Sequence, residues 1–148
     1  MASAHDVASY ILKKRRRMTA MKLQKLVYYS QAWSLVWDEK PLFRERIEAW
    51  INGPVVPNLY RVHRGEYFVS EWPHGSEANL SSVQRDTIDA VLKFYGGKSS
   101  QWLSDLTHAE DPWKQARKGL PPSEPCGNEI THASMAEYYS GVASIQQT

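Results

Sequence analysis

Groups that can transfer protons are concentrated in one short stretch around His108. Asp105 lies three positions before His108, so the two side chains would share one face of a helix and could form an acid–base pair. The same stretch also contains Thr107, Glu110 and Asp111. It falls where one predicted helix ends and Pro112 begins another, and polar residues at such junctions commonly cap free backbone groups. We therefore predict a structural role for these residues, and a small enzyme acting through His108 is the less favoured hypothesis.

The other motifs that could support catalysis or metal binding are weak. The five histidines lack the paired spacing that places two ligands on one metal ion, and Cys126 is the only cysteine. Cys126 cannot form an internal disulfide, and nothing near it in the sequence would activate it as a nucleophile. The sequence contains no glycine-rich phosphate loop and no Gly-x-Ser-x-Gly turn. We expect no metal, no cofactor and no enzymatic activity.

Basic residues form an uninterrupted run from Lys13 to Arg17. Such a run could bind the phosphates of a nucleic acid, with release of counterions, or it could contact an acidic protein. Alternatively, it could stabilise the C-terminus of a helix through the helix dipole. Because no recognition helix or basic stripe accompanies the run, we favour the helix-terminal role, and a nucleic-acid-binding or regulatory module is the alternative.

The elements that must position these groups begin with a long helix after residue 19. Thr19 is its expected N-cap, and Pro41 marks the region where it stops. Apolar residues fall on two sides of this helix, whereas a helix at the protein surface needs only one apolar stripe. We therefore predict a central helix that is packed from two directions, with Lys22 and Lys25 on its remaining, exposed surface.

A short strand is predicted after this helix. Residues 47–51 alternate between apolar side chains and Glu or Trp, which is the period-two pattern of a strand with one buried face. We expect a small hairpin whose turn contains Arg44 and Arg46. Pro54 and Pro57 argue against a long second strand beyond it, so we predict extended backbone there, followed by a helix that begins at Pro57.

The rest of the chain is predicted to form short helices on the same core. Ser81 and Gln84 make a capping box for a helix that ends near Phe94, with Val83 and Phe94 on its packing face. Further expected elements are helices at residues 6–16, from Ser99 or Ser100, from Pro112 and from Thr131 or Ser134, and a loop at residues 120–128. The expected fold is mainly α (α+β), with six or seven short helices around a central helix and a small β-hairpin. We expect a single domain over residues 1–148, comprising a basic N-terminal helix (5–17), a core (18–140) and a short tail (141–148).

The composition of the 148 residues is that of a small intracellular protein. A chain of this length can bury roughly two-thirds of its unfolded surface in one domain. The net charge of +2 is too small to indicate a polyanionic partner by itself. No apolar run approaches the roughly 20 residues that span a bilayer, and the first basic residues follow the apolar ones, unlike those of a secretory signal. These features predict a cytoplasmic location.

The six tryptophans suggest where a partner could bind. Four are expected to face the core, namely Trp33, Trp50, Trp102 and Trp113. Trp37 and Trp72 lie in more polar surroundings and are harder to bury. Because an exposed tryptophan often anchors a protein interface, we predict a partner-contacting patch of Trp72, Tyr67 and Phe68. Closing the core from outside is the alternative role of this patch.

Several motifs together resemble a known family, the Panacea domain of antitoxins from bacterial and phage toxin–antitoxin pairs. They are Lys22-Leu23-Gln24-Lys25-Leu26 followed by Tyr28-Tyr29, Glu48-Ala49-Trp50, Gly53-Pro54-Val55-Val56-Pro57, Leu59-Tyr60, Leu106-Thr107-His108, Asp111-Pro112-Trp113 with Ala116, and Tyr138-Tyr139. The resemblance extends over roughly residues 18–139. The family includes SocA-type proteolytic adaptors and phage-associated GepA-like proteins. One departure is the final tyrosine pair, where Tyr-Phe is common.

The resemblance implies an antitoxin that binds and neutralises a cognate protein toxin. It also implies, for the adaptor type, delivery of that toxin to a protease such as a ClpXP-type machine. The family's motif residues are expected to be structural: Trp33, Trp50, Gly53, Pro54, Pro57, Tyr60, His108, Pro112 and Trp113. Besides the Trp72 patch, the cations predicted to touch a partner are Lys22, Lys25, Arg44 and Arg46.

Overall fold

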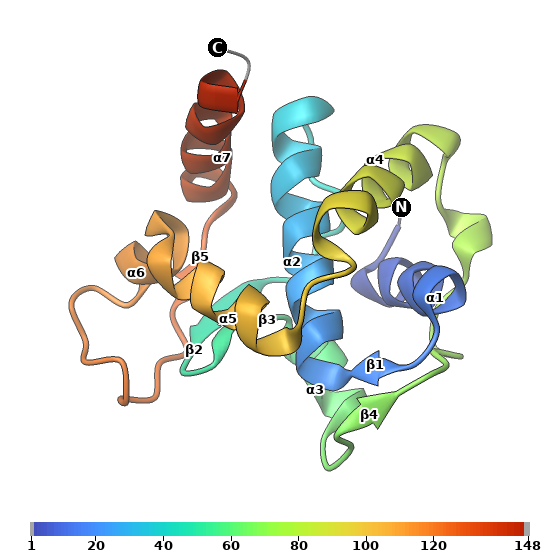
Figure 1. Ribbon diagram of the computed structural model, residues 1–148, viewed down its shortest axis with the longest axis horizontal. Coiled ribbons are helices and arrows are strands. Elements are labelled where there is room, and N and C mark those ends of the chain that lie inside the picture. Colours follow the sequence, from blue (N-terminus) through green and yellow to red (C-terminus); the bar gives the residue numbers. More distant parts are fainter. Residues whose placement is uncertain (1, 147–148) are drawn as a thin grey trace.

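The computed structural model describes residues 2–146, with side chains to residue 143, and shows a mainly helical fold (Figure 1). Its elements are α1 (Ala4–Arg15), β1 (Met18–Thr19), α2 (Ala20–Trp37), β2 (Ile47–Trp50), β3 (Gly53–Val55), α3 (Pro57–His63), β4 (Phe68–Val69), the 3-10 turn η1 (Glu77–Asn79), α4 (Ser82–Tyr95), α5 (Ser100–Ala109), α6 (Asp111–Ala116), β5 (Glu129–Ile130) and α7 (His132–Gln146). These described elements confirm the predicted fold class, with seven α-helices and two small antiparallel sheets. None of the helices between residues 2 and 146 is long and apolar enough to cross a membrane.

Helix α2 runs through the centre of the molecule and packs against α1, α4, α5, α7 and β3 (Figure 1). It begins as predicted, because the Thr19 hydroxyl accepts a hydrogen bond from the Lys22 backbone N–H at 3.1 Å. The prediction that Lys25 lies on an exposed surface is wrong, because its side chain is fully buried. Neighbours on every side leave this helix no solvent-facing stripe until Trp37, which is 48% exposed.

A three-stranded antiparallel sheet with the order β3-β2-β5 lies beside the lower half of α2. The hairpin joins β2 to β3 through Ile51 and Asn52, so the predicted turn at Arg44 and Arg46 is wrong. Extended backbone is expected after residue 52, and it pairs as a strand even though it contains Pro54. Pro54 is tolerated because β3 is an edge strand and its partner, Ala49, directs its own N–H away to Asn128 O at 2.9 Å.

A second, two-stranded ribbon is formed by β1 and β4 at a corner of the molecule below α1 (Figure 1). Met18 pairs with Val69, and Thr19 pairs with Phe68. The ribbon continues into the start of α2, where the Ala20 N–H donates to Tyr67 O at 2.9 Å. The basic run at the end of α1 is therefore followed directly by β1, which pairs with a strand that contains the exposed Phe68.

Helix α4 begins at the predicted capping box, in which the Ser81 and Gln84 side chains each bond the other's backbone N–H. Its predicted packing face is partly wrong, because Val83 and Phe94 are 53% and 56% exposed. Ile88 and Leu92 are buried instead, so the packed face is rotated relative to the expected one.

Trp102 on α5 is predicted to lie in the core, and this prediction is also wrong. It is 39% exposed, with the Lys98 ammonium 4.7 Å from its ring centre. Helix α5 buries Leu103 and Thr107, which leaves Trp102 on its outer side.

Candidate partner-binding groove

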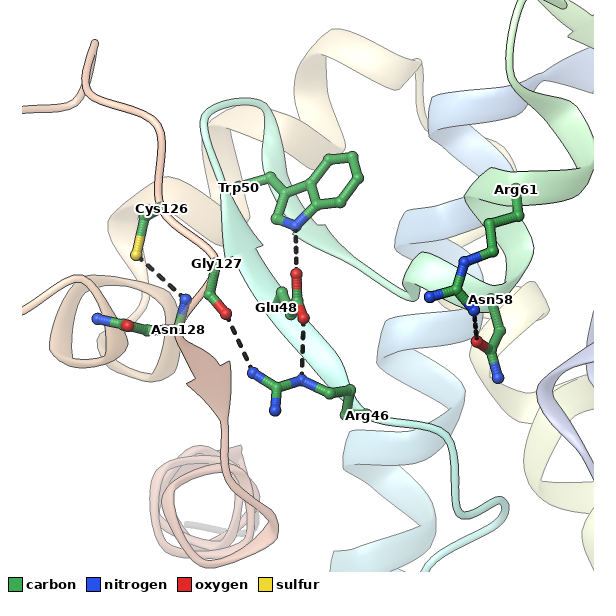
Figure 2. Close-up of polar contacts among 8 residues, drawn as sticks. All are labelled: Arg46, Glu48, Trp50, Asn58, Arg61, Cys126, Gly127 and Asn128. Carbon is green, nitrogen blue, oxygen red and sulfur yellow. Dashed lines mark hydrogen bonds and ion pairs between the residues drawn. The ribbon is translucent and has the colours of Figure 1, made fainter.

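A groove of about 580 Å³ lies on the outer face of the β2–β3 hairpin. Its lining residues are Met21, Glu48, Trp50, Ile51, Asn52, Tyr60, Pro125, Cys126 and Gly127. The alternation along β2 forms it, because Ile47 and Ala49 are buried while Glu48 and Trp50 face outwards. The prediction that Trp50 faces the core is therefore wrong. Helix α3 and the loop before β5 stand on either side of this exposed strand face (Figure 2). We call this feature the hairpin groove.

The polar groups of the hairpin groove are held in one orientation by their own contacts. Glu48 accepts a hydrogen bond from the Trp50 indole N–H at 2.8 Å and forms an ion pair with Arg46 Nε at 2.9 Å. Arg46 also donates to Gly127 O at 3.0 Å, which ties the loop before β5 to the strand (Figure 2). Both carboxylate oxygens of Glu48 are thus engaged, so the groove offers neutral and apolar walls more than a free negative charge.

Contacts hold both the indole ring and the backbone of Trp50 in place. Its ring stands edge-on to Tyr60 of α3, with ring centres 4.9 Å apart. Its backbone carbonyl accepts from the Trp113 indole N–H of α6 at 2.8 Å. Trp113 in turn packs on the His108 ring, with ring centres 4.2 Å apart. Two distant segments, residues 48–60 and 108–113, are therefore joined directly beneath the groove.

Behind the groove, buried amides of α2 bind the backbone of the following segments. The Gln24 amide accepts from the Val56 N–H at 2.9 Å and donates to Val56 O at 3.3 Å, so it pairs with this residue like a neighbouring strand. Gln31 does the same for the chain after the helix, accepting from Leu42 at 2.7 Å and donating to Phe43 O at 2.9 Å. Each of these two buried amides finds its partners, which fixes both segments against the central helix.

Lys25 is the exception among the buried polar groups of this helix. Its Nζ atom has no hydrogen-bond partner among the described residues, and burial lowers the pKa of Lys25 to about 7. A Cβ atom built on Gly53 would come within 2.6 Å of Lys25 Cε and 2.9 Å of Thr107 Oγ1. The lysine therefore fills the space between α2, β3 and α5, and glycine at position 53 provides that space.

The His108 cluster is divided among separate structural roles. Asp105 accepts from Gln101 at 2.8 Å, and Thr107 donates to Ser104 O at 2.8 Å, both within α5. Glu110 is buried and accepts from the Tyr29 and Tyr139 hydroxyls, each at 2.7 Å. Burial raises the pKa of Glu110, and the two hydroxyls oppose that rise.

His108 is half-buried, and its Nε2 atom has no hydrogen-bond partner among the described residues. Burial lowers the pKa of His108, and the nearby Lys25 amine acts in the same direction. The contacts of this cluster support the predicted structural role. No group of three or more His, Cys, Asp or Glu residues in the described part of the chain could hold a metal ion.

Arg117 secures the loop that forms the far wall of the groove. Its guanidinium donates to Ala49 O and Pro121 O, each at 2.9 Å, and to Glu124 O. The side chain is only 2% exposed and lies 4.8 Å from the Trp113 ring centre. One cation therefore connects β2, α6 and the loop over residues 120–128.

These contacts join the sequence motifs that carry the family resemblance. A comparison with known families supports that resemblance. Residues 23–114, more than half of the chain, match the SocA-like antitoxin family through its Panacea domain. The chain belongs to this family. No curated protein and no solved structure gives a significant match.

The matched part of the Panacea domain begins in α2 and ends in α6. It includes the Gln24–Val56 pairing, Lys25 and the Trp50–Trp113 bond. The match does not include Arg117, which holds the loop over residues 120–128, or Tyr139, which donates a hydrogen bond to Glu110. The matched segment thus contains most of the contacts that hold the hairpin against α2, and residues after it supply the remaining ones.

The structure separates the residues predicted to contact a partner. Four are exposed on the surface of the Panacea domain, namely Arg44, Arg46, Tyr67 and Phe68. Lys22 is half-buried, and Lys25 is inaccessible. Only Arg46 borders the hairpin groove through the contacts described above.

Trp72 does not form the predicted exposed patch with Tyr67 and Phe68, because it is only 5% exposed. Its indole N–H donates to His5 Nδ1 at 3.1 Å, and the loop around it folds onto the start of α1. Asp6 holds this loop by accepting from the Ser76 N–H at 2.9 Å. The tryptophan closes the core, which is the alternative role given above.

The predicted motif residues of the Panacea domain are buried or half-buried. Those with little or no exposure are Trp33, Gly53, Pro54, Pro112 and Trp113, and those in an intermediate position are Trp50, Pro57, Tyr60 and His108. Sequence reasoning missed the buried roles of Gln24, Gln31, Glu110 and Arg117. A signal existed for the two glutamines, since both lie between the apolar stripes of α2 and a buried amide there needs backbone partners.

Proposed function

We propose that this protein is an antitoxin that neutralises a cognate protein toxin by binding it directly at the hairpin groove. Membership of the SocA-like antitoxin family is the observation that supports the proposal most strongly. The chemistry of the described surface also fits a binding role, because the dense proton-transfer groups near His108 are engaged in structural contacts. We propose that the protein acts by binding and is not an enzyme.

The hairpin groove suits an apolar side chain presented by the toxin. Its Glu48 is neutralised by Arg46, and its Trp50 is held in place by Tyr60 and by the contacts beneath it. A rigid aromatic wall loses little conformational entropy when a partner binds. Ile51, at the tip of the hairpin, is 39% exposed and would be covered by such a partner.

The proposal is tested by expressing the product of the adjacent gene alone and together with this protein. We expect growth arrest by the neighbour alone, rescue by this protein, and copurification of the two proteins. Ile51→Asp should abolish rescue and weaken binding, because it places a charge in an apolar contact. The hairpin turn exposes this residue, so folding should be unaffected.

Val83→Asp is the matched control, since Val83 is 53% exposed on α4, away from the hairpin. It should preserve rescue. A harmless neighbour, or toxicity that this protein leaves unchanged, would remove the antitoxin proposal. Equal rescue by the Ile51 and Val83 variants would exclude the hairpin groove as the toxin-binding site and leave the antitoxin role unchanged.

Delivery of the bound toxin to a protease, as in SocA-type adaptors, is a further part of the proposal. It requires that the toxin be degraded faster in the presence of this protein. Toxin half-life after a block of protein synthesis, compared in cells with and without a ClpXP-type protease, distinguishes delivery from simple sequestration. Equal half-lives in the two strains would leave sequestration alone.

A further inference from the structure

The positive charge of this protein comes from one short segment. The run from Lys13 to Arg17 supplies five of the 18 Lys and Arg residues, which leaves 13 cations against 16 Asp and Glu residues. The rest of the chain thus carries a formal charge of −3, although the whole chain has +2. A charge distribution this uneven indicates an anionic partner at the basic segment more clearly than the net charge does.

The structure divides the basic run into two parts. Lys13, Lys14 and Arg15 end α1 and have partners within the protein. Lys13 pairs with Glu77 at 2.5 Å, Lys14 lies over the Tyr10 ring, and Arg15 donates to Leu92 O at 2.8 Å. These three cations fit the helix-terminal role favoured from the sequence. Arg16 and Arg17 lie beyond the helix and need another explanation.

Arg16 has a backbone conformation that L-residues rarely adopt, with φ 61° and ψ −143°. Glycine would relieve this strain, yet the position carries a large exposed cation. A hollow of about 660 Å³ opens beside it, and its polar lining residues are Ser9, Lys13, Arg16, Arg17, Ser70 and Glu71. Lys13 is already paired with Glu77, so Arg16, Arg17 and two hydroxyls remain in this lining beside one carboxylate, Glu71. This set of groups suits an anion such as phosphate.

Exposed aromatic rings continue this basic surface along the β1–β4 ribbon. The Arg17 guanidinium lies over the Phe68 ring, 4.1 Å from its centre. Phe68 is 46% exposed, and the neighbouring Tyr67 is 73% exposed, with the two rings edge to face at 4.8 Å. The pairing of Thr19 with Phe68 places the strand after Arg17 against these rings. Cations that track a backbone, beside aromatic rings on which bases stack, are the two components of a site for single-stranded nucleic acid.

We propose that the corner formed by the end of α1 and the β1–β4 ribbon binds single-stranded nucleic acid. Arg16 and Arg17 contact phosphates at the hollow, and Tyr67 with the Arg17–Phe68 stack receives the bases. The end of α1 and the β1–β4 ribbon lie on the opposite side of α2 from the loop that walls the hairpin groove (Figure 1). Tyr67 shares a hollow with Met21 and Tyr60, which also line that groove, so the nucleic-acid test is made without the toxin. From the sequence, nucleic acid was disfavoured because no recognition helix or basic stripe accompanies the basic run. The structure instead places the run beside exposed aromatic rings.

Fluorescence anisotropy of the full-length protein with labelled 12-nucleotide dT and rU strands tests the site. We expect binding that weakens with salt. Arg16→Gln together with Arg17→Gln should reduce the slope of log affinity against log salt by about 1.4, or about 0.7 for each lost phosphate contact. Tyr67→Ala should lower affinity about 5- to 150-fold, which is the usual loss for one stacked base.

Matched controls keep charge and aromatic content equal. Lys93→Gln with Lys118→Gln removes the same charge elsewhere, and Phe94→Ala removes a ring that is 56% exposed on α4. Both controls should bind like the wild type, and thermal melting should show that every variant is folded. A 12-base-pair duplex should bind more weakly than the single strands, because its bases cannot reach the rings.

Three results would overturn the proposal. The first is no salt-sensitive binding of either strand, and the second is equal or tighter binding of the duplex. The third is tighter binding of polyglutamate than of either strand, with the same loss in the Arg16 and Arg17 double variant, which would assign the corner to an acidic protein.

Discussion

The buried amine of Lys25 should make the stability of this protein depend on pH in a specific way. Its pKa is about 7 in the folded protein, against 10.5 for a lysine that is not buried. The folded state therefore binds fewer protons than the unfolded state between these values, and stability must rise with pH across this window. Below the folded-state pKa the full penalty for burying the charge is present.

Lys25→Met removes this penalty while keeping a similar side-chain length in the space beside Gly53. At 1.36 kcal/mol for each pKa unit, the amine costs about 5 kcal/mol at about pH 6 and about 2 kcal/mol at about pH 9. We expect the variant to be more stable than the wild type, with an advantage that falls by about 3 kcal/mol between these pH values. Burial also lowers the pKa values of His63 and His108, and both imidazoles are present in the wild type and in the variant.

Urea denaturation of the wild type and the Lys25→Met variant, followed by tryptophan fluorescence at several pH values, measures this difference. Lys22→Met is the matched control, because Lys22 lies on the same helix but is only half-buried. Its substitution should give a much smaller pH-dependent difference. A Lys25→Met advantage that stays constant within about 1 kcal/mol from pH 6 to pH 9 would refute the reasoning. A variant less stable than the wild type throughout would show that the amine has a partner in solution.

Two further predictions concern the packing around this lysine and the acceptor at the end of α5. Gly53→Ala should destabilise the protein by about 2–4 kcal/mol, because its Cβ would collide with Lys25 and its φ is 112°; Gly119→Ala, with φ 80° and no atom within 4 Å of its Cβ, gives the cost of the backbone conformation alone. Equal losses at the two glycines in urea denaturation would contradict the packing argument. Glu110→Ala should cost about 2–4 kcal/mol by leaving the buried Tyr29 hydroxyl without its acceptor, whereas Glu110→Gln should cost clearly less because an amide oxygen can still accept. Similar losses for the two Glu110 variants would show that cavity formation dominates.

The contacts explain the positions of two buried glutamines on α2. Gln24 and Gln31 are seven positions apart, two turns along α2, and each binds the backbone of a segment that follows the helix. An apolar residue at either position would leave backbone groups of residues 42–43 or 56 buried without partners. The two amides thus fix where the hairpin and the chain before it attach to the central helix.

The sequence alone determined the features that depend on neighbours a few positions away. The helix starts at Thr19, Pro57 and Ser81 are predicted correctly, because a cap or a proline acts on backbone groups within the next turn. The alternation over residues 47–51 likewise identifies β2, although Trp50, which was expected to face the core, lies on its outer face. The family resemblance rests on the same local motifs.

Only the tertiary structure decided which of these local surfaces became buried. Lys25 lies outside the two apolar stripes of the helix, where an exposed lysine is expected. It is buried because β3 and α5 cover it. Trp72 lies in a polar loop, and it is buried because Asp6 draws that loop onto α1. The hairpin turn at Ile51 and the anchoring of its loop by Arg117 also depend on residues far apart in the chain. Long-range contacts of this kind have no local pattern, because the free energy that selects them comes from covering apolar surface and pairing polar groups across separate elements.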